Sequence, residues 1–194
     1  MTPKKQLWML VGGNGAGKST FYKKFLEPRG IPFVNADILA KKMFPDDPEA
    51  NSYEAAKYAE KIRQQLLTDG INFCFETVFS HPSKIDFVAK AKALGYEIIL
   101  VAIHVEHASL NKARIAQRVE EGGHSVPEQK VEERIPRALQ NIRKVLVLCD
   151  QVRILDNSRF DNPFIQVARL QNNSVSQYAS PLPVWASELL SDYL

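Results

Sequence analysis

The most constraining feature of the sequence is a glycine-rich motif near its start. Residues 12–19 read Gly-Gly-Asn-Gly-Ala-Gly-Lys-Ser and match the pattern G-x-x-x-x-G-K-[ST]. The apolar run at residues 7–11 is typical of a strand buried on both faces of a parallel sheet, and a helical stretch at residues 19–26 follows the motif. A strand, a glycine-rich turn and a helix in this order form a P-loop. The sequence therefore predicts a site for a nucleoside triphosphate.

The chemistry of the motif assigns a role to each part. Glycines let backbone N–H groups curl around phosphate oxygens, and the start of the helix adds a partial positive charge. Lys18 is expected to reach the β- and γ-phosphates, and the Ser19 hydroxyl to bind Mg²⁺. The residues expected to contact the nucleotide in this segment are Gly12, Gly13, Asn14, Gly15, Ala16, Gly17, Lys18, Ser19 and Thr20.

Length and composition favour a single soluble domain. The chain has 194 residues, of which 45% are apolar and 24% charged, and its net charge of +3 is spread rather than clustered. Nothing in this pattern calls for nucleic acid, and no apolar run approaches the ~20 residues that span a bilayer. Cys74 and Cys149 lie in apolar runs without metal-ligand spacing, as expected of reduced thiols. We expect one cytoplasmic domain, residues 1–194, without a membrane or nucleic-acid partner.

The alternation of strands and helices predicts the fold. It favours a three-layer α/β sandwich of the P-loop NTPase type, with a mainly parallel five-stranded sheet, a small helical lid at about residues 109–148 and a C-terminal hairpin. The expected strands are 7–11, 31–34, 72–75, 97–104 and 151–155, with hairpin strands at 164–170 and 174–178. The expected helices are 19–26, 38–43, 50–68, 83–94, 109–121, 127–148 with a kink at Pro136, and 183–194. The buried face predicted for helix 50–68 carries Tyr53, Ala56, Ala59, Ile62 and Leu66.

Two acidic residues follow predicted strands, at the edge of the sheet where α/β proteins bind ligands. Asp37 could accept the proton of an acceptor hydroxyl opposite the γ-phosphate, or it could cap the helix that begins at Ile38. Glu76 could orient the acceptor, hold magnesium through water, or cap the segment from Thr77 onward. No apolar strand ends in the aspartate of a usual Walker B motif, so one of these acids is expected to serve the metal. Asn157 lies at the same rim.

The region between residues 109 and 143 is rich in arginine, and two readings of it remain open. The arginines could form a solvated basic face, or a lid could swing them over the triphosphate around Gly122-Gly123-His124. His124 could donate to phosphate or be an ordinary exposed loop residue. The arginines of this region are Arg114 and Arg118, four positions apart, Arg134 and Arg137, three positions apart, and Arg143.

The ordered set of motifs resembles the zeta-toxin family of P-loop kinases, particularly its short members known as predicted ATPases. The resemblance runs from about residue 6 to residue 158. Its motifs are the P-loop, Asn35-Ala-Asp37, Phe75-Glu-Thr77, Gly95-Tyr-Glu97, Arg118-Val-Glu-Glu-Gly-Gly-His-Ser-Val-Pro127 and Val152-Arg-Ile-Leu-Asp-Asn-Ser158.

The resemblance implies an activity and a role for several residues. Better-known members phosphorylate a sugar hydroxyl of UDP-N-acetylglucosamine with ATP and Mg²⁺. By motif, Lys18 would bind phosphates, Asp37 would be the general base, Glu76 and Thr77 would support the acceptor, and Arg118 would stabilise phosphate charge. The family's second arginine falls nearest His124, so His124, Arg134 or Arg137 would supply that charge. The lid is also shorter than in the toxins.

Three functions remain open at this point. The first is an ATP-dependent kinase that acts on a small acceptor such as a UDP-sugar. The second is a nucleotide-dependent binding module held by an antitoxin-like partner. The third is a kinase for a nucleoside or antibiotic hydroxyl.

Overall fold

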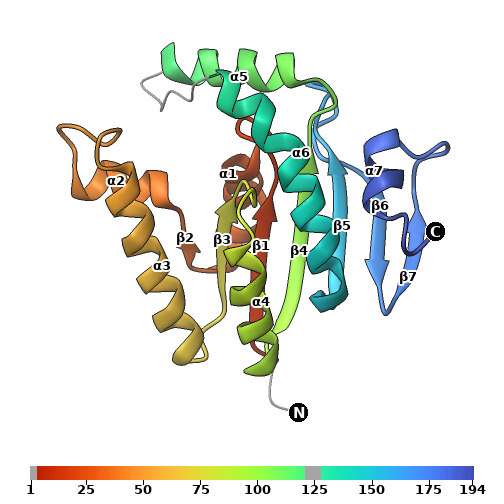
Figure 1. Cartoon of the computed structure of the whole chain (residues 1–194), viewed down its shortest axis with the longest axis horizontal. Coiled ribbons are helices and arrows are strands. Elements are labelled where there is room, and N and C mark those ends of the chain that lie inside the picture. Colours follow the sequence, from red (N-terminus) through yellow and green to blue (C-terminus); the bar gives the residue numbers. More distant parts are fainter. Residues whose placement is uncertain (1–3, 121–127) are drawn as a thin grey trace.

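The protein is a central sheet covered by helices on both faces (Figure 1). The computed structural model describes residues 4–120 and 128–194. The sheet has seven strands in the order β2-β3-β1-β4-β5-β6-β7. Strands β2, β3, β1, β4 and β5 run parallel, and β6 and β7 are antiparallel to their neighbours. The predicted α/β class with a mainly parallel sheet is confirmed.

The elements follow the expected order closely. The strands are β1 (Gln6–Val11), β2 (Phe33–Val34), β3 (Phe73–Thr77), β4 (Glu97–His104), β5 (Gln151–Asp156), β6 (Ile165–Gln171) and β7 (Ser174–Gln177). The helices are α1 (Lys18–Phe21), α2 (Ala36–Met43), α3 (Ser52–Thr68), α4 (Ser83–Ala93), α5 (Ala108–Glu120), α6 (Glu128–Val145) and α7 (Val184–Leu189). A π-helix (Tyr22–Leu26) and a 3₁₀ turn (Glu27–Arg29) continue α1, and a second 3₁₀ turn (Leu146–Leu148) follows α6.

Two expectations about the elements need correction. The hairpin is not separate from the sheet, because β6 pairs with β5 and extends the five parallel strands to seven. The closing helix α7 ends at Leu189 rather than at the last residue. Helix α6 contains Pro136 as expected, and the kink expected there stays a prediction. A hairpin whose first strand carries buried Val167, Ala168 and Leu170 buries more apolar surface on the sheet than beside it.

Strand β1 divides its side chains between two cores. Leu7, Met9 and Val11 are buried on the face that carries α3, α4, α6 and α7. Trp8 and Leu10 are buried on the opposite face, against α1 and the turns that follow it. This alternation is the period of two that a strand buried on both faces requires. The central position of β1 fixes where the P-loop leaves the sheet.

The buried face predicted for the helix after residue 50 is wrong in part: Ala59 is buried and Leu66 packs against the core, but Tyr53, Ala56 and Ile62 are exposed. Helix α3 buries Ala55, Ala59, Arg63 and Leu67, at a spacing of four residues. The Tyr53 side chain is 74% exposed and Ile62 is 37% exposed, although both had been placed in the core. Small alanine side chains let α3 approach its neighbours closely, whereas counting large apolar residues directs attention to the wrong face.

No helix in the described part of the chain combines the length and the apolar character needed to cross a membrane.

His104 makes the stability of the fold depend on pH. Its ring, at the end of β4, packs against the Trp185 ring at 4.5 Å between centroids. Burial lowers the pKa of His104 from 6.5 to about 4, and the Asp156 carboxylate opposes this shift. The unfolded chain therefore takes up a proton near pH 6.5 that the folded chain excludes until about pH 4. The stabilisation is complete above pH 6.5 and is lost as the pH falls toward 4.

We predict that the free energy of unfolding of the wild type falls by up to roughly 3 kcal/mol between pH 6.5 and 4 because of this group. His104→Gln cannot titrate and should flatten that part of the profile. Urea unfolding at pH 7, 6, 5 and 4 measures both curves, with His81→Gln, a change at an exposed histidine, as the control. Parallel curves for wild type and His104→Gln would contradict the assignment.

Candidate nucleotide and acceptor site

The P-loop lies too close to neighbouring backbone and side chains to carry side chains at three of its glycines, Gly12, Gly15 and Gly17. Gly12 has φ +148°, and a Cβ built on it would lie 2.0 Å from the Ile103 carbonyl oxygen at the end of β4. Gly17 has φ +98°, and its Cβ would lie 2.5 Å from Asn157 Nδ2. Glycine avoids both the contact and the left-handed strain. The motif therefore forms the narrow loop that a phosphate-binding site requires.

The two reactive side chains of the P-loop form hydrogen bonds within the protein. The Lys18 side chain is buried, and its Nζ donates to the carbonyl oxygens of Gly12 at 3.0 Å and Gly13 at 2.9 Å. The Ser19 hydroxyl donates to Glu76 Oε2 at 2.6 Å. Lys18 is thus held against the loop, and Ser19 is joined to the acidic residue near the end of β3.

Asp37 is not the cap of its helix. The Asn35 side chain caps α2, because its Oδ1 accepts from the backbone N–H of Asp37 at 2.8 Å and of Ile38 at 3.1 Å. Helix α2 accordingly begins at Ala36, and Asp37 lies exposed in its first turn. The capping alternative weighed for Asp37 is wrong because asparagine two positions earlier takes that role. The carboxylate of Asp37 is left to face the cleft.

A cleft of about 590 Å³ brings these groups together. Asp37 and Glu76 bring carboxylates to it, whereas Lys18, Lys24, Arg114 and Arg159 bring cations. The remaining lining residues are Asn14, Gly15, Gly17, Ser19, Thr20, Gln117, Asn157, Phe160, Pro163 and Phe164. Carboxylates and cations thus share one space.

Arg114 is the arginine of the expected lid that the structure places in this cleft. It lies half-buried on α5, and its Nη1 is buried without a hydrogen-bond partner among the described residues. Asn14 Oδ1 in the P-loop is buried and unpartnered in the same way. The spacing of Arg114 and Arg118 places both on one helix face, which is a pattern visible in the sequence. Arg134 and Arg137 have a similar spacing, so the pattern did not identify Arg114 as the arginine in the cleft.

Asn157 joins the segment after β5 to the P-loop. Its Nδ2 donates to the Ala16 carbonyl oxygen at 2.8 Å, and its Oδ1 accepts from the Phe164 backbone N–H at 3.2 Å. Both ends of the buried amide are therefore used within the protein. The position expected for nucleotide binding also serves as a clamp on the loop. Sequence reasoning missed Lys24, Gln117, Arg159, Phe160, Pro163 and Phe164, which contribute to the same cleft.

The other expected residues fall into two groups. Thr77 does not line the cleft, since its Oγ1 accepts from the Phe79 backbone N–H at 3.0 Å and shapes the following turn. Arg137 is exposed and paired with Glu133 at 3.2 Å, and half-buried Arg134 is absent from the cleft lining. The side chain of Arg118 and all of His124 lie outside the described residues, as does the Gly122-Gly123 segment.

The residues near the P-loop fit ATP with Mg²⁺. Ser19 and Glu76 provide adjacent oxygen atoms, which are the ligands that Mg²⁺ prefers, and this ion commonly takes one or two protein oxygens together with phosphates. The unpartnered Asn14 and Arg114 atoms supply an acceptor and a donor for a polar ligand. Among the described residues, no group of three or more His, Cys, Asp and Glu side chains could hold a metal alone. A Mg²⁺ ion at this place would take its remaining oxygen ligands from water or from a bound phosphate.

The fold and the cleft together define a P-loop, kinase-like α/β protein. The chain belongs to the AAA domain family, whose model matches residues 7–144. An uncharacterized protein of Haemophilus influenzae is 29% identical over 138 residues, which cover 68% of this chain and 98% of that protein.

Solved structures share the fold. The AvrRxo1-ORF1:-ORF2 structure with ATP superposes with a TM-score of 0.75 at 17% identity and covers 93% of this chain, which spans 63% of that one. A structure of the PezAT toxin–antitoxin system of Streptococcus pneumoniae gives a TM-score of 0.65 at 19% identity, covering 100% of this chain and 80% of that one. The zeta-toxin-like kinase fold expected from the motifs is thus confirmed at the level of fold.

The Asn157 clamp can be tested by truncation. Asn157→Ala leaves the Ala16 carbonyl and the Phe164 N–H without their partner, and we predict a loss of roughly 2 kcal/mol in the free energy of unfolding. Because the P-loop loses a support, ATP affinity should fall as well. Denaturant unfolding and calorimetric ATP titration measure the two effects. Asn162→Ala, at an exposed position nearby, should change stability by no more than about 0.5 kcal/mol. Equal effects of the two variants would contradict the proposed role of Asn157 in holding the P-loop.

Proposed function

We propose that the protein is an ATP- and Mg²⁺-dependent kinase that transfers the γ-phosphoryl group to a hydroxyl of a small acceptor. One observation carries the proposal. Asn35 caps helix α2, so the Asp37 carboxylate is not used as the cap. Asp37 shares a cleft with Lys18, to which we assign phosphate binding, and with Glu76, which accepts a hydrogen bond from Ser19. Phosphoryl transfer needs this combination of a base, a phosphate grip and a metal-side oxygen pair. The cytoplasm, where ATP is abundant, is the proposed location.

Each side chain then has a task. Asp37 accepts the proton of the acceptor hydroxyl, and Glu76 and Ser19 hold the metal, which supplies charge neutralisation when bound. Lys18 and Arg114 stabilise the phosphate charge as it spreads during transfer. Phe160, Pro163 and Phe164 offer an apolar wall on which a nucleotide base can rest. The lid assigned to residues 109–148, with Arg118 and His124, belongs to this proposal, and Arg134 or Arg137 would have to move to take part.

The experiment for the whole function is ADP release from ATP in the presence of a panel of acceptors. The panel contains UDP-N-acetylglucosamine and other UDP-sugars, nucleosides, free sugars and aminoglycoside antibiotics. Release that depends on one acceptor, with a phosphorylated product seen by mass spectrometry, supports the kinase and identifies its acceptor class. ATP binding without release across the panel contradicts it.

Asp37 can be tested separately from nucleotide binding. Asp37→Asn keeps the shape of the side chain but removes the base, so transfer should fall by ~10²–10⁴-fold. ATP affinity should stay within a few-fold, because Asp37 is not expected to contact the donor. Asp46→Asn, an equal change at an exposed position on the loop after α2, should leave both quantities unchanged. Full transfer by Asp37→Asn would show that another group is the base.

Arg114 gives a test at the phosphate end. Arg114→Gln removes a cation that meets charge developing in the transition state, so kcat should fall by roughly 10²-fold. The KM for ATP should change less, because the missing contact strengthens only as charge moves to the phosphate. Arg143→Gln is the matched control, since Arg143 is exposed, is paired with Asp192 and does not line the cleft. An equal drop in kcat in both variants would show that the loss of any positive surface charge lowers kcat, and would contradict a specific role for Arg114.

A second candidate is a nucleotide-dependent binding module with little transferase activity. Two of the similar structures favour it. One contains AvrRxo1-ORF1 together with AvrRxo1-ORF2, and the other belongs to a toxin–antitoxin system. An antitoxin-like partner would then be the principal ligand. Affinity capture with tagged wild type in the presence and absence of ATP tests this, and a stoichiometric partner retained without any acceptor-dependent ADP release would replace the kinase proposal.

A further inference from the structure

Three arginines gather on the face of the sheet that carries α1, outside the cleft described above. Arg29 ends the 3₁₀ turn after α1, Arg153 lies on β5, and Arg169 lies directly opposite Arg153 on β6. The guanidinium carbons of Arg29 and Arg153 lie 5.1 and 5.7 Å from the centre of the Trp8 ring. One buried indole therefore holds two of the three cations in place.

These cations have no carboxylate counter-ion among the residues that the structure describes. Within residues 4–120 and 128–194, none of the three forms an ion pair with a carboxylate. Arg169 Nη2 donates to Gln151 Oε1 at 3.2 Å, and Gln151 in turn donates to Glu97 at 3.0 Å. Arg169 Nε is buried without a partner. Burial and the charges of Arg169 and Arg29 lower the pKa of Arg153.

Directly opposed like charges destabilise a sheet. Arg153 and Arg169 are such a cross-strand pair, and each is half-buried. Their repulsion is a cost within the isolated chain that an anion between them would remove. The arrangement resembles a site prepared for a ligand more than a solvated surface, on which arginines separate.

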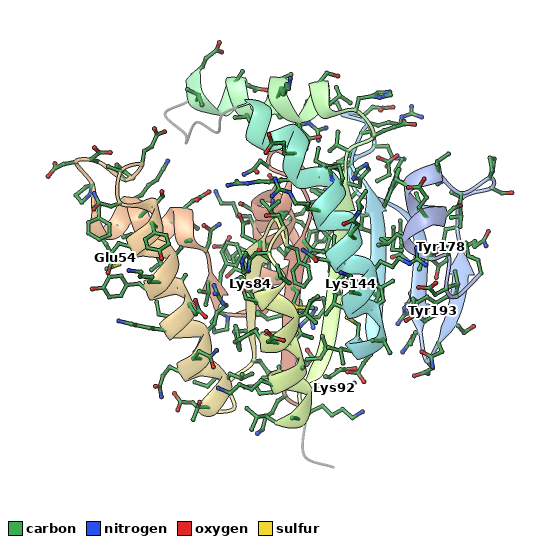
Figure 2. The ribbon with its side chains drawn as sticks, viewed as in Figure 1. Glu54, Lys84, Lys92, Lys144, Tyr178 and Tyr193 are labelled. Carbon is green, nitrogen blue, oxygen red and sulfur yellow. The ribbon has the colours of Figure 1, made fainter. Side chains whose placement is uncertain are left out.

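The space beside the arginines has two parts. A cavity of about 510 Å³ is lined by Arg153, Gln166, Arg169 and Tyr178, and Figure 2 labels Tyr178 beside the sheet edge formed by β6 and β7. A second cavity, of about 300 Å³, shares Arg153 and Gln166 with the first and adds the Arg29 side chain. Its apolar walls come from Phe21, Phe25, Leu26, Leu155 and Phe164. A cationic end thus continues into an aromatic end.

We propose that this arginine groove, defined by Arg29, Arg153, Gln166, Arg169 and Tyr178, is a second ligand site, which takes a small molecule bearing a phosphate or sulfate ester on an apolar or planar group. Guanidinium groups match the oxygens of phosphate and sulfate, and several of them together favour a ligand with more than one negative charge over a single carboxylate. The aromatic end accepts the planar group. The cavities have the size of small-molecule sites, and the modest net charge of +3 does not favour a nucleic acid.

The groove differs from the P-loop cleft in composition and position. It contains none of the charged residues proposed for catalysis, and among the described residues Phe164 is the one that lines both the 300 Å³ cavity and the nucleotide cleft. The proposal therefore stands or falls independently of the kinase activity.

Nuclear magnetic resonance of the full chain tests the groove with AMP and inorganic pyrophosphate as probes. The indole N–H signal of Trp8, identified by its persistence in Trp185→Phe, reports on the groove, and backbone signals of Gly15 and Gly17 report on the P-loop. We expect AMP to shift the Trp8 signal saturably with a Kd below about 1 mM. Arg29→Gln, at an exposed position, and Arg153→Gln/Arg169→Gln should each weaken that binding roughly 10-fold or more without changing the P-loop shifts.

The control is Arg143→Gln, which removes an exposed arginine paired with Asp192 on another part of the surface. It should leave the Trp8 titration unchanged. Pyrophosphate should bind more weakly than AMP, and equal affinity would contradict the role of the aromatic end. A Trp8 signal that does not respond, or responds equally in the arginine variants, overturns the site. A response to a polyglutamate peptide but to neither probe overturns the ligand class in favour of an acidic protein partner.

Discussion

Close backbone contacts and hydrogen bonds hold the P-loop against the other elements of the site. Gly12 lies against the end of β4 and Gly17 against the segment after β5, at distances that no side chain permits. Hydrogen bonds reach the loop from three segments of the chain. Asn111 on α5 donates to the Asn14 carbonyl at 2.6 Å, Glu76 on β3 accepts from Ser19, and Asn157 donates to Ala16. A shift of the loop would therefore disturb all three.

The sequence was most informative where chemistry is local. The P-loop pattern and the succession of strands and helices along the chain could be predicted. The positions of Asp37 after strand two and of Glu76 near the end of strand three could be predicted too, because parallel strands bring their carboxyl ends to one edge. Asn35 as the cap of α2 was also readable in principle, since asparagine favours that position. The error arose from starting the helix at Ile38 rather than at Ala36.

The features that could not be predicted from the sequence depend on the pairing register between strands and on how each helix is rotated about its own axis. Arg153 and Arg169 are opposite each other only because β6 pairs with β5 in one register. Helix α3 shows the same limit, since two alanines and an arginine occupy its buried face while Tyr53 is exposed. Arg114 could be separated from the arginines of α6 only by seeing which helix closes over the P-loop. Local pattern specifies elements, and packing selects among their faces.

The hairpin formed by β6 and β7 has a consequence for how the protein behaves at high concentration. Without it, the sheet would end at β5, a strand with buried Val152, Ile154 and Leu155 and a full row of unpaired backbone groups. With it, the sheet ends at a strand of four residues, Ser174–Gln177, of which three are exposed and polar. Short polar edges offer a poor template for another chain. By pairing with β5, the hairpin keeps the apolar edge of that strand from pairing with another chain and so opposes edge-to-edge aggregation.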